Sequence, residues 1–339
     1  MRRLILIPAF LLIFFADLFA QKRTEDFEIT LPAQKINNSL YNTIEYIDSR
    51  YDTTFMGIVQ LGAFNKKAKV VPETPFSTQL KNALNSLTDA TSKDGELLFQ
   101  LRQFNFAELT GAMSEKGYCY LRAVLYAKQD GHYQRINSID TVIFIRAMDV
   151  TRALFRKGSK TITDFIAAGL LKESSDSNYY SFNDVINMDS IEKRGIKVYN
   201  TPKYTDGLYF DYQSFKDQIP DKQVVVEKKN DKIVSVTTLN EKGKSVKVKA
   251  QHVYSVVANG EPFIATDYGF YPLKKVDDDF KFVGKARVNA NTGDVIAASA
   301  FFGIVGGLIA SNAQAIFEMK IDYINGGFIR LKEVDGNYE

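Results

Sequence analysis

Asp48, Arg50 and Asp52 are one group of residues in this sequence that could do chemistry, and they stand between two strand-like segments. A guanidinium makes strong, often bidentate hydrogen bonds to carboxylates, so an arginine with carboxylates on both sides most often forms an ion pair inside the fold. If N–H groups of the guanidinium stay unpaired, the arginine can instead bind a ligand. Asp48 and Arg50 are therefore candidate ligand-binding residues.

Three carboxylates, Glu108, Glu115 and Asp140, form a second group. A carboxylate pair can act as acid and base if the fold holds the two groups at a suitable separation, which makes a hydrolase one hypothesis. The sequence contains no P-loop, no G-x-S-x-G turn, no H-E-x-x-H and no Cys-x-x-Cys, and His132 and His252 lie in separate segments. We therefore predict no catalytic residue, no cofactor and no metal site, and favour a protein that is not an enzyme.

Tyrosines alternate along residues 118–127 and give this predicted strand two distinct faces. The face with Cys119 belongs to the core; Cys119 is the single cysteine, so an intramolecular disulfide is excluded and a small buried hydrophobe is expected. Tyr118, Tyr120 and Tyr126 on the opposite face are the candidate site of a glycan- or peptide-binding module. The alternative is that helices or neighbouring strands cover these rings.

An α+β domain over residues 40–171 would position these side chains. Alternation predicts strands, and apolar residues repeated every three or four positions predict helices. Strands are expected at 41–47, 57–64, 96–107, 118–127 and 139–145, with one helix over 75–87 and two after Asp149 that Gly158 separates. The order predicts a mixed α/β sandwich, a sheet with helices on one side. A change of parity near residues 102–103 predicts a β-bulge.

The rest of the chain divides into a leader, a linker and a second domain. Residues 21–39 are polar and predict a flexible leader, and residues 172–205 are polar with little periodicity and predict a linker. Residues 206–335 predict a mainly antiparallel β domain, because short strands alternate with turn signals. Its strands are expected at 223–227, 233–238, 246–250, 253–257, 263–265, 280–288, 317–321 and 328–331.

Residues 295–317 carry no charge and are rich in glycine and alanine. The length would permit a membrane span, but polar residues dilute the run and Gly306 and Gly307 weaken a helix. Gly303 and Gly307 have the G-x-x-x-G spacing, which lets two helices approach closely. Three interpretations stay open: a buried part of the second domain, a segment in or on the membrane, and a docking surface for a partner. Membrane or partner contact would involve Phe301, Phe302, Gly303, Gly306 and Gly307.

Residues 1–20 predict a cleavable signal peptide. Two arginines precede an apolar run of about a dozen residues, and Ala20 supplies the small residue before the cut. Position 21 is Gln, so lipid anchoring through the signal is not expected. The chain of 339 residues has a net charge of +3 with both signs interspersed, which excludes a nucleic-acid partner.

Two stretches resemble known groups of exported proteins. Tyr46, Asp48 and Arg50 leading into Met56 and Gly57, then a helix and two long strands, resemble the small envelope lipoproteins of the YajG type over residues 40–171. That resemblance implies a compact α+β fold in the Gram-negative envelope, although this chain lacks their lipid-bearing cysteine. Residues 206–220 and 253–264 are similar to uncharacterised exported proteins of Bacteroidota-type bacteria, which implies a source and a compartment.

These features favour an exported cell-envelope protein, in the periplasm, at the outer membrane or outside the cell, with a non-catalytic binding or assembly role. The alternatives are a glycan- or peptide-binding module built on the tyrosine face and a hydrolase built on carboxylates. The sequence identifies no ligand, partner or oligomeric state. If residues 295–317 are exposed, they would contact another envelope protein or the membrane.

Overall fold

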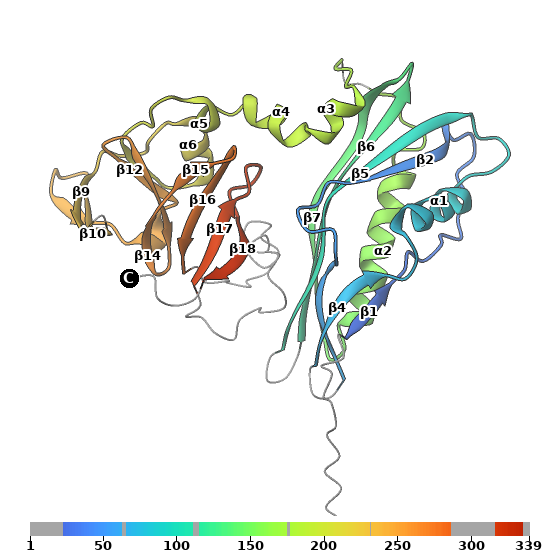
Figure 1. The fold of residues 1–339 in the computed structure, drawn as a ribbon, viewed down its shortest axis with the longest axis horizontal. Helices are drawn as coiled ribbons and strands as arrows, with labels where there is room; N and C mark the ends of the chain where they lie inside the picture. Colours follow the sequence, from blue (N-terminus) through green and yellow to red (C-terminus); the bar gives the residue numbers. More distant parts are fainter. Residues whose placement is uncertain are drawn as a thin grey trace, which may run out of the picture.

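The computed structural model describes residues 23–62, 66–110, 115–174, 177–230, 232–285 and 316–334, so the predicted signal peptide lies outside the described residues. A helical segment joins two domains (Figure 1). The first domain is a mixed sheet with helices, and the second is made of antiparallel sheets. The predicted α+β class is thereby confirmed.

A seven-stranded sheet dominates the first domain, in the order β1-β4-β3-β5-β6-β7 with β2 paired to β5. Its strands are β1 (Thr24–Phe27), β2 (Tyr41–Asp48), β3 (Gly57–Leu61), β4 (Lys66–Pro72), β5 (Gly95–Thr110), β6 (Glu115–Gln129) and β7 (His132–Ala147). The long strands β5, β6 and β7 are antiparallel, whereas β2 and β3 join β5 in parallel. These long strands carry the candidate site described below.

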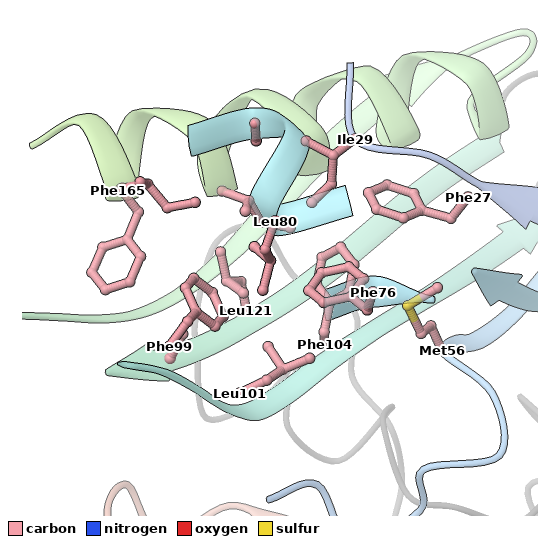
Figure 2. Close-up of a cluster of buried hydrophobic side chains, with 14 of the residues drawn as sticks. Phe27, Ile29, Met56, Phe76, Leu80, Phe99, Leu101, Phe104, Leu121 and Phe165 are labelled. Carbon is pink, nitrogen blue, oxygen red and sulfur yellow. The ribbon is translucent and has the colours of Figure 1, made fainter. Parts of the chain in front are cut away.

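Helices α1 (Phe76–Leu87) and α2 (Thr151–Ala167) cover one face of this sheet. Apolar residues of both helices and alternate residues of the strands form one core, and Figure 2 shows Phe27, Phe76 and Phe104 gathered within it. The Phe27 and Phe104 rings meet edge to face at 5.1 Å between centroids. Cys119 is fully buried in this core, as predicted.

The expected flexible leader is wrong, because residues 23–29 are part of the first domain. β1 pairs in parallel with β4, and Phe27 and Ile29 are buried. The Gln79 side chain on α1 accepts a hydrogen bond from the Ile29 N–H (2.8 Å) and donates one to the Phe27 carbonyl (3.2 Å). The sequence missed this strand because only its last residue is apolar.

The expected helix break at Gly158 is also wrong, because α2 runs through it. A Cβ atom at this position would lie 3.3 Å from the Phe106 ring and 3.4 Å from the Cys119 sulfur. Glycine therefore lets the helix approach the sheet closely, at a small cost in helix propensity. The bulge predicted at residues 102–103 is confirmed, since the β5–β6 register shifts between Leu101 and Gln103.

The predicted linker contains three short helices, α3 (Phe182–Ile186), α4 (Met188–Arg194) and α5 (Lys197–Asn200). Ser181 and Asp184 form a capping box that starts α3. Val185 and Met188 pack on Leu98 and Tyr126, which lie on the face of the sheet away from α1 and α2. The linker thus covers part of the outer face of the first domain.

The described residues of the second domain form three small antiparallel sheets and helix α6 (Tyr212–Asp217). Its elements are β8 (Gly207–Tyr209), β9 (Val225–Lys229), β10 (Lys232–Leu239), β11 (Ser245–Lys247), η1 (Ala250–His252), β12 (Ser255–Ala258), β13 (Glu261–Thr266), β14 (Gly269–Pro272), β15 (Lys274–Val276), β16 (Asp279–Gly284), β17 (Ile316–Ile321) and β18 (Phe328–Val334). The expected closing hairpin is present: β17 pairs with β18 and with β16.

Most of the uncharged segment 295–317 lies outside the described residues, including Phe301, Phe302, Gly303, Gly306 and Gly307. Only its last two residues are described, and they begin β17. Within the part of the chain that the structure describes, no helix is both long and apolar enough to cross a membrane. The three interpretations of this segment stay predictions.

Candidate ligand site between the two domains

Two buried arginines lie on the outer face of the first sheet. Arg122 follows Tyr120 on β6 and points to the same face, and Arg102 is the extra residue of the β5 bulge. Their exposed fractions are only 6% and 7%. A charge at such a position must be paired, because burial removes its hydration.

Arg122 is paired mainly with a carboxylate of the second domain. Its Nη1 and Nη2 donate to the two oxygens of Asp322 at 3.1 and 2.9 Å, and Nη2 also donates to Asp140 at 3.0 Å. Tyr120 contacts the same guanidinium through its hydroxyl. Asp322 lies just after β17, is only 2% exposed and also accepts the Ile324 N–H. This bidentate pair therefore joins the two domains.

Arg102 is paired with the linker and with the same turn of the second domain. Its Nη2 donates to Asp189 (2.6 Å) and Glu192 (2.8 Å) of α4 and contacts the Tyr323 hydroxyl. Tyr323 donates to Glu192 at 2.5 Å, and Arg135 of β7 donates to the other Glu192 oxygen at 3.0 Å. Strands β5 and β7, helix α4 and the turn after β17 thus share one polar network.

The protonation states of this network are fixed by its ion pairs. Burial alone would lower the pKa of Arg102, but Asp189 and its other partners raise it above the ordinary value. Burial alone would raise the pKa of Glu192, but Arg102 outweighs it and holds that pKa below its usual range. Burial, with Asp189 and Glu192 as further causes, raises the pKa of Tyr323. Arg102 therefore stays charged, Glu192 stays ionised and Tyr323 stays neutral near neutral pH.

A cavity of about 390 Å³ lies beside this network, a volume in the range of small-molecule sites. Both domains and the linker contribute to its wall. The lining residues are Arg102, Arg122, Ala123, Val124, Arg135, Ser138, Ile139, Asp140, Glu192, Ile196, Lys216, Tyr323 and Ile324. The cavity therefore has both charged and aliphatic walls.

Three cationic side chains that line the cavity have nitrogens without a partner in the described part of the chain. The buried Nε atoms of Arg122 and Arg135 have no partner among the described residues. Lys216 of α6 forms no ion pair within the described ranges. Each of these Nε atoms exposes less than 1 Å² of surface, so a molecule in the cavity would reach them only if the surrounding side chains moved. Lys216 is the lining cation that remains available to a bound molecule.

The two carboxylates that line the cavity are already paired. Among the described residues no Cys or His lines the cavity, and arginines pair with both lining carboxylates, Asp140 and Glu192. Tyr323 is hydrogen-bonded to Glu192. No lining side chain has the unengaged carboxylate or activated nucleophile that a hydrolytic mechanism needs.

The tyrosine face does not form an open platform. Tyr118, Tyr120 and Tyr126 are exposed by 2% or less. Tyr126 is covered by the linker and donates to Gln100, and Tyr120 is covered by the turn after β17, where the Asn325 amide donates to its hydroxyl. Of the two interpretations of this face, the structure therefore supports the one in which other elements cover the rings: the linker covers Tyr126, the turn after β17 covers Tyr120, and Tyr118 packs against Phe144 of β7.

Asp48 and Arg50 form the structural ion pair that was the first interpretation of their spacing. Arg50 donates to both Asp48 oxygens, at 2.8 Å from Nε and 2.6 Å from Nη2, and to the Phe55 carbonyl at 3.0 Å. Asp52 instead accepts from Thr54. The pair stabilises the loop between β2 and β3, and neither residue lines the cavity. Because the Arg50 guanidinium already donates to Asp48 and to the Phe55 carbonyl, its role in ligand binding stays a prediction.

The three carboxylates of the hydrolase hypothesis do not converge. Asp140 pairs with Arg122 at the interdomain network. Glu108 is only 2% exposed on β5 and accepts from the Gln60 N–H at 2.8 Å, and burial raises its pKa to about 7. Glu115 contributes to that shift and lines a separate pocket of about 500 Å³ with Asp149. Glu108 is therefore a buried proton-binding group, separate from Asp140.

Sequence reasoning missed Arg102, Arg135, Asp322 and Tyr323 as site residues. Arg122 did carry a signal, because a charged residue inside a strand with tyrosines on either side needs a buried partner. Its main partner lies 200 positions away in the chain, and no local pattern connects the two.

Comparisons with known proteins assign no family to this chain. No family model matches it, and no curated protein matches it significantly. A solved structure from Xanthomonas campestris, described as a DUF330 protein, is similar at a TM-score of 0.29 and 11% identity, over 50% of this chain and 99% of that one. A likeness at this level carries no function to this chain, and the resemblances drawn from the sequence stay predictions.

Proposed function

We propose that this chain is an exported cell-envelope protein with a non-catalytic binding role, and that its ligand occupies the cavity between the two domains. The export part rests on the signal-peptide pattern of residues 1–20 and places the protein in the periplasm or at the outer membrane. The binding part rests on one observation: a cavity of about 390 Å³ to which both domains and the linker contribute, with charged Arg102, Arg122, Arg135 and Lys216 and several aliphatic side chains in its lining.

The position of the cavity supports this function. Arg122, Val124 and Ser138 come from the first sheet, Ile196 follows α4, and Lys216 comes from the second domain. Small-molecule sites often lie at domain interfaces, where a concave surface is assembled from separate units. A molecule bound here would contact both domains, and its binding would favour their present arrangement.

The test is to look for a bound molecule that depends on the cavity. The full chain, with its own residues 1–20, is expressed in a Gram-negative host and purified from the fractionated envelope. A Ser138→Phe variant fills the cavity from an exposed position on β7, opposite Val124. Ser245→Phe on β11, outside the cavity, is the matched control. Mass spectrometry then identifies small molecules released on denaturation.

We expect the wild type and S245F to release a compound that S138F does not. Release of the same compounds by all three proteins, or of none, would contradict the binding role. Recovery of the mature protein from the cytoplasm would contradict the export part alone.

A further inference from the structure

We infer that the first domain binds a small amphiphile, with one alkyl chain and one negatively charged head group, in a groove along helix α2. This site is separate from the interdomain cavity, so the inference goes beyond the proposed function. The groove has a volume of about 690 Å³, larger than that cavity. Most of residues 30–36, the end of α1 and one face of α2 line it.

The wall of the groove opposite α2 is a stretch of chain that runs alongside this helix. The Thr30 N–H donates to the Ser159 hydroxyl in the middle of α2 at 2.7 Å. The Leu40 N–H donates to the Leu170 carbonyl just past the end of the helix at 2.8 Å. Residues 30–40 therefore follow α2 in the same direction, and the groove extends from the middle of the helix toward its C-terminal end.

Helix α2 contributes one stripe of its surface to the groove. The lining residues of this helix repeat every three or four positions and therefore share one face. They are Arg156, Ser159, Lys160, Thr163, Asp164 and Ala167. From the first to the last of them the helix rises by about 16 Å, at about 1.5 Å per residue. A stripe of this length suits an extended chain better than a compact ligand.

One end of the groove has a net positive charge. Its charged lining residues are Arg156, Lys160 and Asp164. Lys160 donates to both Asp164 oxygens at 2.7 Å, so these two charges cancel. Arg156 is exposed and forms no ion pair within the described residues. Its guanidinium can therefore pair with one anionic head group without breaking an existing ion pair.

The other end of the groove is aliphatic. Ile36, Leu87 and Ala167 line it there, and the Ile36 N–H donates to the Leu87 carbonyl at 2.7 Å. Leu31 and Pro32 continue the apolar wall toward Arg156. An alkyl chain that covers these side chains removes their apolar surface from water, which favours binding. A head group at Arg156 and a chain that extends toward Ala167 match both ends of the groove.

Decanoate is the probe, compared with 1-decanol and decylammonium by isothermal titration calorimetry on the purified mature protein. Arg156→Gln removes the unpaired charge, and Arg156→Lys restores it. Lys157→Gln removes the neighbouring exposed charge of α2, outside the groove. Ala167→Phe fills the apolar end, and Ala168→Phe places the same ring on the exposed next residue. Ser138→Phe fills the interdomain cavity instead.

We expect the wild type to bind decanoate more tightly than 1-decanol or decylammonium. R156Q should weaken decanoate binding about tenfold, through the loss of one charge-assisted hydrogen bond, and should leave 1-decanol binding unchanged. R156K should recover most of this loss, and K157Q and A168F should bind decanoate as the wild type does. A167F should weaken the binding of decanoate and 1-decanol alike, whereas S138F should change neither.

Several results would overturn the inference. The wild type may not bind decanoate less tightly than decylammonium, and equal effects of R156Q and K157Q would show that Arg156 holds no head group. Loss of decanoate binding in S138F but not in A167F would place the ligand in the interdomain cavity. If A167F does not fold, the comparison of R156Q with K157Q and S138F decides. Because S138F and R156Q change different sites, either site can fail without the other.

Discussion

Replacement of Asp322 by Asn tests the pair that joins the two domains. The side chain keeps its size and one acceptor oxygen but loses its charge, so the Arg122 guanidinium keeps only the half-exposed Asp140 as an ionic partner. The exposed fractions of the paired side chains are 7% for Arg122 and 1% for Asp322. Breaking a buried pair from one side costs about 3–5 kcal/mol, because the other charge stays buried.

We expect D322N to lower the free energy of unfolding by about 3 kcal/mol, at the lower end of that range, because Asp140 remains. Asp164→Asn is the control: its pair with Lys160 is exposed by 61% and 65%, so its loss should cost less than about 0.5 kcal/mol. Urea unfolding followed by circular dichroism and by tyrosine fluorescence gives both midpoints and shows whether the domains unfold together.

A double-mutant cycle then isolates the pair. Arg122→Met alone leaves Asp322 buried without its cation, but in the D322N background it should cost at least about 1.5 kcal/mol less than in the wild type. A D322N effect within 0.5 kcal/mol of D164N, or additive effects of the two substitutions, would refute the reasoning that this pair couples the domains.

Three other predictions concern the first domain. Burial raises the pKa of Glu108 from 4.5 to about 7, so its folded state holds a proton that the unfolded state releases. This contribution of about 3 kcal/mol is full below pH 4.5 and is lost as the pH rises through about 7, and Glu108→Gln should flatten that slope in urea unfolding across pH 4–8. Gly57→Ala should lower the free energy of unfolding by about 3 kcal/mol, because the new Cβ would lie 2.0 Å from the Phe106 carbonyl oxygen. Gly62→Ala, also at positive φ but in open space, should lower it by only about 1 kcal/mol, and equal losses in thermal unfolding would argue against the clash. Burial raises the pKa of the Cys119 thiol, so Ellman's reagent should react with it only in denaturant, and fast reaction of the native protein would contradict the core packing.

Much of the fold follows from local patterns in the sequence. The core face of β6 was predicted because strict alternation places Cys119 and its alternate neighbours on one side. The bulge was predicted from a change of parity within β5, and this bulge adds Arg102 to the outer face of the sheet. β1 was missed because its residues are mostly polar. This segment forms a strand because it pairs with β4.

The site could be predicted only in part, because its partners are far apart in the chain. Tyr118, Tyr120 and Tyr126 were assigned to the outer face, but a strand buried on both faces has the same alternation as one that faces solvent on one side. Arg122 meets Asp322, and Arg102 meets Asp189 and Tyr323, through tertiary packing alone. Because these groups are far apart in the sequence, no local pattern could predict the network or the cavity beside it.

A crystal structure of the mature protein purified from the envelope tests the central claim most directly. We predict electron density for a non-protein molecule in the interdomain cavity, in contact with side chains of both domains such as Val124, Ser138 and Lys216. A cavity that is closed by protein side chains, or that holds only water, would contradict the account.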